Sequence, residues 1–176
     1  MKKLIAFLLA GMFALALFAC NGDRPGPTGN TPTTQSGSSP AQDIYFAPKG
    51  VRIEMGAAPA PVLEALGEPK NTFESPSCAL KAKDINYNYP GFVLTVTYPE
   101  QGEDYITQVQ FDNDDYKTPA GITIGSAFED VLTAYGTDYE EKSGHYYYTQ
   151  GLSVLHFAIK NDKVAQLSFE YDFINA

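Results

Sequence analysis

The sequence has no tryptophan, only two cysteines and two histidines, and few basic residues: 12 Lys and Arg stand against 21 Asp and Glu. Two cysteines cannot form a disulfide scaffold, and the histidines and thiols are too few to indicate a zinc site. A formal net charge of −9 argues against a nucleic-acid-binding protein, because neutralising phosphates requires clustered Lys and Arg. We therefore expect no nucleic-acid partner, no metal and no cofactor.

The first twenty residues have the pattern of an export signal. Met1-Lys2-Lys3 precedes an apolar run over residues 4–18, and a cationic start before such a run is typical of a secretory signal peptide. The run ends at Leu17-Phe18-Ala19-Cys20, which resembles the lipobox of bacterial lipoproteins. That resemblance implies lipidation of Cys20 and anchoring to the cell membrane on its extracytoplasmic side. An ordinary signal peptide, an uncleaved anchor and an incidental thiol are the alternatives.

Residues 21–43 are rich in Pro, Gly, Ser and Thr and nearly devoid of aliphatic side chains. Such a segment cannot bury enough apolar surface to offset its chain entropy, so we expect a flexible linker. Treated as a coil, it spans roughly 25 Å on average. The folded part would therefore stand off from the membrane.

From Ile44 onward, four short sequence blocks occur twice in the same order. Residues 48–53, 62–67, 93–96 and 106–112 match residues 119–124, 131–136, 154–157 and 164–170, respectively. This similarity predicts a duplication within one domain, with residues 44–115 as the first repeat and 116–176 as the second.

Each repeat has the pattern of one helix followed by three strands. In the second repeat, Ser126 and Glu129 suggest a capping box, apolar residues at helical spacing run from Phe128 to Tyr135, and Gly136 ends the helix. Six segments have strand character: residues 84–89, 92–98, 105–112, 145–148, 153–159 and 164–171.

Alternation within these strands separates an apolar face from a polar face. The apolar residues expected to meet the helices are Leu94, Val96, Val109, Phe111, Leu155, Phe157, Leu167 and Phe169. We therefore predict an α+β fold, in which two tandem helix-plus-three-strand repeats form one antiparallel sheet with the helices on one face.

This pattern resembles the tandem repeat of the β-lactamase-inhibitor-protein-like fold and, in a single copy, the small outer-membrane assembly lipoproteins. Residues 121–126 with 131–136 are also similar to uncharacterised lipoproteins of anaerobic Gram-positive bacteria. The resemblance covers about Pro48 to Tyr171. In the inhibitor proteins, partners dock on a concave, aromatic-rich sheet. This chain has no tryptophan and no recognisable inhibitory loop, so lactamase inhibition does not carry over.

The sequence shows no catalytic constellation. Cys78 lies in Ser-Pro-Ser-Cys without an adjacent base, whereas a catalytic thiol needs a neighbouring group that lowers its pKa. Residues 112–115 offer oxygen ligands for Ca²⁺ but lack the glycine and distal Glu of a calcium loop. A solvated acidic connector is the favoured interpretation. We predict that the protein is not an enzyme.

Tyrosine is abundant, with 12 copies, and residues 146–148 are three in a row on one predicted strand. At least Tyr147 or both of its neighbours must face water, and exposed tyrosine is typical of binding surfaces. The alternative is that tyrosine merely favours strands. The candidate binding residues of the polar face are Tyr147, His156, Gln166, Ser168, Asn88, Thr95, Thr97 and Gln108.

These features predict an exported, lipid-anchored, non-catalytic binding module at the cell envelope. Its partner would be an envelope component or an envelope or extracellular protein, recognised through the polar sheet face. Two alternatives remain open: an envelope enzyme acting on glycans or peptides, and a structural assembly factor of an envelope complex.

Overall fold

The computed structural model describes residues 43–77 and 81–176. The predicted signal peptide, nearly all of the predicted linker, Cys20 and Cys78 lie outside the described residues. Within the described ranges, no helix is long and apolar enough to cross a membrane.

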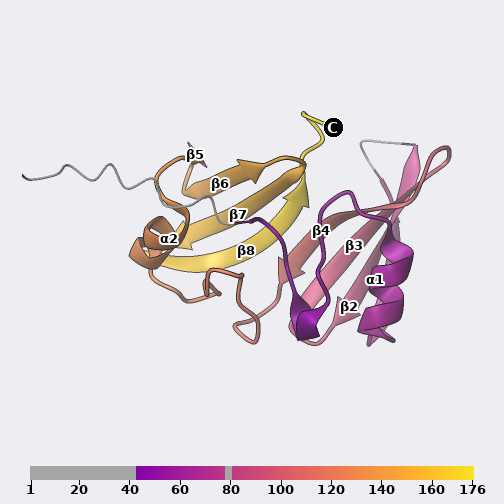
Figure 1. The fold of residues 1–176 in the computed structure, drawn as a ribbon, viewed down its shortest axis with the longest axis horizontal. Helices are drawn as coiled ribbons and strands as arrows, with labels where there is room; N and C mark the ends of the chain where they lie inside the picture. Colours follow the sequence, from indigo (N-terminus) through magenta and orange to yellow (C-terminus); the bar gives the residue numbers. More distant parts are fainter. Residues whose placement is uncertain (1–42, 78–80) are drawn as a thin grey trace, which may run out of the picture. The chain divides into compact units, whose positions relative to one another are not determined.

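The described residues form one eight-stranded antiparallel sheet in the order β1-β2-β3-β4-β8-β7-β6-β5 (Figure 1). The first elements are η1 (Pro48–Gly50), α1 (Pro59–Leu66), β1 (Asn71–Pro76), β2 (Ala82–Tyr89), β3 (Phe92–Pro99) and β4 (Tyr105–Phe111). They are followed by α2 (Phe128–Tyr135), β5 (Glu140–Lys142), β6 (His145–Gln150), β7 (Ser153–Lys160) and β8 (Lys163–Tyr171).

The predicted fold class, α+β with two tandem helix-plus-three-strand repeats, is wrong. The described part is mostly β, with a single eight-stranded sheet and two α-helices, and four strands follow each helix. The unforeseen strands, β1 and β5, are the two edges of the sheet. Almost every residue of β1 and all of β5 are exposed, so neither has the alternating apolar pattern that reveals a strand.

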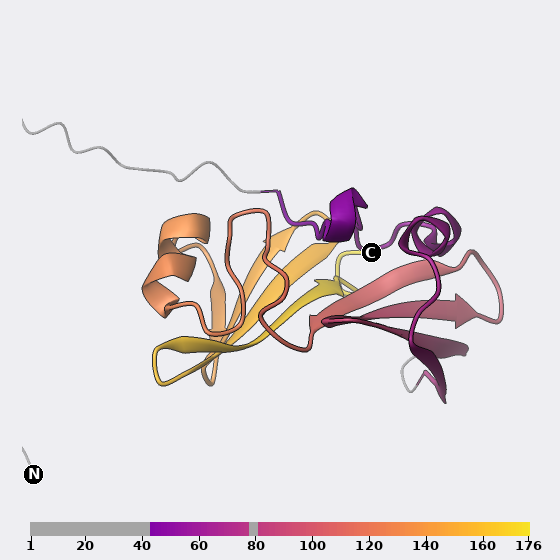
Figure 2. The ribbon, with the colours of Figure 1, turned by 90° about the horizontal axis from the view of Figure 1, so that it is seen from below.

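The core lies between the sheet and the helices, which cover the same side of it (Figure 2). Leu94, Val109, Leu155 and Leu167 are fully buried on this inner face, as their alternation predicts. The two central strands, β4 and β8, pair over residues 108–110 and 168–170.

An aromatic cluster covers the β4–β8 junction. Phe46, from the segment before α1, lies 4.8 Å from Phe111 of β4 and 5.9 Å from Phe169 of β8, measured between ring centroids. Phe46 and Phe169 are almost completely buried. Because one ring contacts both central strands, the two halves of the sheet share a hydrophobic core.

The predicted capping box at α2 does not form. Ala127, not Ser126, is the N-cap, and no side chain caps the helix. The Ser126 hydroxyl instead accepts a hydrogen bond from the backbone N–H of Thr123 at 3.1 Å. The N–H of Phe128 donates to the carbonyl of Asp162 at 2.9 Å, so the turn between β7 and β8 satisfies the start of the helix.

Candidate functional site

The sheet face turned away from the helices, here called the outer face, carries mostly polar side chains. Paired residues on neighbouring antiparallel strands share a face, so the register defines rows across the sheet. One row contains Phe73, Asn86, Thr95, Gln108, Glu170, Val154 and Thr149. The next contains Asn71, Asn88, Val93, Gln110, Ser168, His156, Tyr147 and Glu140.

Three rings stack on the outer face over β6 and β7. Tyr147 lies opposite His156, with ring centroids 4.7 Å apart and planes within 10°. His145 lies beside His156, with ring centroids 5.0 Å apart and planes within 18°, and its centroid is 6.5 Å from that of Tyr147. We call His145, Tyr147 and His156 the ring stack. His145 and Tyr147 are half-buried, and the His156 side chain is 12% exposed, so a partner would contact mainly the first two rings.

A chain of hydrogen bonds holds the ring stack to the sheet. His145 Nδ1 and His156 Nε2 are 2.8 Å apart, and His156 Nδ1 lies 3.1 Å from Ser168 Oγ and 3.2 Å from Glu170 Oε1. The Ser168 hydroxyl donates to Glu170 Oε1 at 2.6 Å. These contacts fix the plane of the His156 ring.

Glu170 is the ionised end of this chain. Burial raises the pKa of its carboxyl group, but hydrogen bonds from His156, Ser168 and Gln108, together with the histidine's charge, bring that pKa below its usual value. The carboxylate therefore remains an acceptor for all three side chains at neutral pH.

Ser168, His156 and Glu170 are the three residue types of a nucleophilic triad, and they lie in contact. In a triad, the imidazole lies between the hydroxyl and the carboxylate and uses a different nitrogen for each. Here Ser168 and Glu170 share His156 Nδ1, and the serine donates its proton to the carboxylate. Ser168 is also only 5% exposed. The arrangement holds the ring stack in place and does not activate a nucleophile.

No group of three or more His, Cys, Asp and Glu side chains gathers in a metal-binding arrangement within residues 43–77 and 81–176. The acidic connector predicted at residues 112–115 is exposed. There, the Asn113 amide donates to the Asp115 carboxylate at 2.8 Å, and Asn113 Oδ1 accepts from the Asp115 backbone N–H at 3.0 Å. These oxygens thus bond within the segment.

The outer face of β1–β4 carries mainly side-chain amides and hydroxyls, with Phe73 on its edge strand. The Asn88 amide donates to Asn71 Oδ1 at 2.7 Å, and the Thr95 hydroxyl donates to Asn86 Oδ1 at 2.8 Å. A hollow of about 380 Å³ lies here, and we call it the amide hollow. Its lining consists of Phe73, Asn86, Asn88, Val93, Thr95, Gln108 and Gln110.

The predicted binding residues fall into two groups on this one face. Tyr147, His156 and Ser168 meet at the ring stack, with Gln166 two residues before Ser168 on β8. The others, Asn88, Thr95, Thr97 and Gln108, lie on β2–β4.

Two of the predicted residues are too buried to contact a partner. Thr97 is 2% exposed and donates to Asp84 Oδ1 at 2.6 Å, and Ser168 supports Glu170 from beneath the surface. The remaining predicted residues are at least partly accessible.

The candidate binding residues predicted from the sequence do not include four residues of the outer face: His145, Glu170, Asn86 and Phe73. The first three lie two residues from Tyr147, Ser168 and Asn88 on the same strands, so strict alternation could have placed them on the same face. Phe73 belongs to β1, the exposed edge strand that no pattern indicated.

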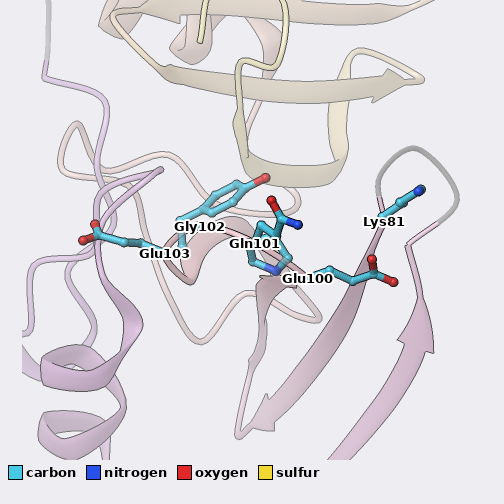
Figure 3. Close-up of a pocket in the computed structure, with 7 residues that line it drawn as sticks. Lys81, Glu100, Gln101, Gly102 and Glu103 are labelled. Carbon is cyan, nitrogen blue, oxygen red and sulfur yellow. The ribbon is translucent and has the colours of Figure 1, made fainter.

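A further hollow, of about 630 Å³, lies at the turn between β3 and β4 (Figure 3). Lys81, Glu100 and Glu103 contribute its charged groups. The Glu103 carboxylate points away from Lys81 and Glu100, on the opposite side (Figure 3). The three charged groups therefore do not converge on one point of the hollow.

No family model and no curated protein matches the chain. A solved structure described as an extracellular protein containing a SCP domain, from Bacillus anthracis str. Ames, is similar to 78% of this chain with a TM-score of 0.50. The identity is 11%, and the match covers 50% of that protein, so the chain spans about half of its length. At this identity the similarity shows the fold alone. The resemblance to the β-lactamase-inhibitor-protein-like fold stays a prediction.

Proposed function

We propose that the protein is an exported, lipid-anchored, non-catalytic binding module at the cell envelope, and that the outer face recognises a protein or another envelope component. The ring stack is the observation that carries this proposal. Tyr147 and His145 offer flat ring surfaces with hydrogen-bonding edges, while His156, whose two ring nitrogens are both engaged within the protein, orders them. Such groups give broad contact area and lose little side-chain entropy on binding.

The hydrogen-bond chain below the ring stack supports the same function. Ser168 and Glu170 hold His156, and His156 holds His145, so these side chains are ordered before a partner arrives. Pre-ordering lowers the entropy lost on association and thereby favours affinity.

The non-catalytic part of the proposal rests on the bond pattern of Ser168. Its hydroxyl proton is committed to Glu170 and its side chain is buried, whereas an enzymatic nucleophile must face both its base and a substrate.

The export and anchoring part of the proposal rests on the sequence. Residues 1–20 have the signal pattern, and Cys20 ends a lipobox-like segment, both outside the described residues. An anchored cysteine followed by a flexible linker would present the outer face to other envelope components.

A pull-down from envelope extracts tests the proposal. We expect Tyr147→Ala/His156→Ala to lose partners that the wild-type protein retains, because the double substitution removes two of the three rings. Glu64→Ala/Glu129→Ala is the matched control, since both side chains are exposed on the helices. Circular dichroism would verify that both variants fold. Identical partner sets for all three proteins would contradict a role for the outer face.

A further inference from the structure

The amide hollow on β1–β4 is lined by no charged side chain. The protein has 12 basic and 21 acidic residues, yet the residues that line this hollow are one phenylalanine, one valine, one threonine and four amides. A charged ligand would lose its hydration there without gaining an opposite charge. The lining therefore suits an uncharged ligand.

Neighbouring side chains orient three of the four amides. Thr95 occupies Asn86 Oδ1, which leaves the Asn86 Nδ2 protons as donors. Asn88 gives a proton to Asn71, which leaves Asn88 Oδ1 as an acceptor. Gln108 bonds to the Glu170 carboxylate through its amide, which leaves its carbonyl oxygen. The hollow thus presents donors and acceptors together, both already positioned.

Phe73 gives the hollow an apolar wall. Its ring is 62% exposed and comes from the edge strand beside Asn86, its cross-strand partner. A large exposed aromatic beside amides is typical of ligand sites, where an apolar surface supplies contact and a few polar groups fix orientation.

The strands under the hollow use most of their main-chain groups in the sheet, apart from an irregularity between Thr95 and Val96. Strands β2 and β3 pair along their full lengths, and β3 pairs with β4 below the hollow. The sheet ladders use these N–H and C=O groups. A ligand on the floor of the hollow would therefore be recognised mainly by the side chains, whose spacing is about 4.8 Å across strands and about 6.6 Å along one strand.

We propose that the amide hollow binds a neutral carbohydrate, with the apolar face of a sugar ring against Phe73 and its hydroxyl groups bonded to Asn86, Asn88 and Gln110. A hydroxyl group both donates and accepts, which matches the mixed donors and acceptors of the amides. The inference rests on the proposed function, because the hollow belongs to the outer face, and it names the class of envelope component.

Titration calorimetry of the full-length chain in a mild detergent tests this inference. The probes are tetrasaccharides of β-1,4-linked N-acetylglucosamine, β-1,4-linked glucose and α-1,4-linked glucose. Tetragalacturonate is the carboxylated comparison, and the capped peptide acetyl-Ala-Asn-Ala-Asn-amide is the peptide comparison. We expect at least one neutral tetrasaccharide to bind, and the tetragalacturonate and the peptide not to bind.

Substitutions locate the site. We expect Phe73→Ala and Gln110→Leu each to weaken saccharide binding about tenfold, the size of effect expected for one aromatic or hydrogen-bonding contact. Both side chains are exposed, so their replacement leaves the core intact. Gln101→Leu makes the same chemical change in the turn between β3 and β4 and should leave the affinity unchanged.

Three results would overturn the inference: no neutral tetrasaccharide binds at millimolar concentration, the peptide alone binds, or the Phe73 and Gln110 variants bind as tightly as the wild type. These three results concern saccharide binding alone. The pull-down tests the proposed function separately. If the ring-stack variant loses its partners while saccharides do not bind, the outer face recognises something else.

Discussion

The two halves of the sheet, β1–β4 and β5–β8, are alike on the inner face and different on the outer face. In each half, a tyrosine hydroxyl donates to the carbonyl of the glycine that ends the preceding helix: Tyr89 to Gly67 at 3.1 Å and Tyr148 to Gly136 at 2.9 Å. On the outer face, one half carries mainly amides and hydroxyls, together with Phe73 and Asp84, whereas the other carries imidazoles, a phenol and the Glu170 carboxylate.

The fold restricts the side-chain types of the inner face and leaves those of the outer face free to vary. Inner side chains must fill a close-packed space and satisfy buried polar groups, so few residue types fit. Outer side chains need only be compatible with a pleated, solvated surface. The outer face can therefore carry two different surface chemistries on one scaffold.

The largest expected effect concerns the shared core. Phe169→Ala removes a fully buried ring from β8 that contacts Phe46 and Phe111. We expect it to lower the free energy of unfolding by about 3–5 kcal/mol. Because the core spans both halves, the backbone amides of Leu94 and Leu155 should lose their protection from hydrogen exchange together as urea is added. Loss of protection at Leu155 alone would show that the halves unfold separately.

A smaller effect is expected at the two helix-ending glycines. Gly67 has φ 77° and ψ −164°, and Gly136 has φ 81° and ψ −162°, a region essentially restricted to glycine. No atom lies within 4 Å of an added Cβ at either position, so only backbone strain should matter. We expect Gly67→Ala and Gly136→Ala each to destabilise the protein by about 1–3 kcal/mol. Thermal denaturation would measure both, and a cost at only one site would contradict the likeness of the inner faces.

The smallest effect is the acid dependence of the ring-stack half. The folded-state pKa of Glu170 is below its ordinary value of 4.5, so its contribution to stability is present above pH 4.5 and lost as the pH falls through the folded-state pKa. We expect Glu170→Gln to be less stable than the wild type at neutral pH and to lose less stability on acidification below pH 4.5.

Urea titrations at several pH values would check this difference, with Glu64→Gln as the control for removing one exposed negative charge. Parallel pH profiles for Glu170→Gln and the wild type would contradict the stabilising role of the Glu170 contacts.

The sequence predicts the inner face well because burial imposes a period on it. The alternation of Leu94 and Val96, and of Leu155 and Phe157, places these side chains in the core, where they are fully buried. Gly136 ends its helix as predicted. The edge strands β1 and β5 were missed because an exposed strand imposes no such period, and the repeat architecture was therefore wrong.

The outer face could be predicted as a set of residues but not as a site. Alternation places Tyr147 and His156 on it, but stacking of their rings depends on the β6–β7 register. The link from His156 to Glu170 depends on the β7–β8 register, in which His156 pairs with Ser168 and Glu170 with Val154. Sequence spacing alone does not give registers between strands, because they follow from turn geometry and core packing together.

Site-specific photo-cross-linking tests whether the outer face is the recognition surface. A benzophenone side chain would replace Tyr147 on the outer face or Glu64 on α1, and the tagged protein would be irradiated in intact cells. The account predicts a discrete cross-linked species from position 147 and none from position 64. Cross-links from position 64 with none from position 147 would contradict it.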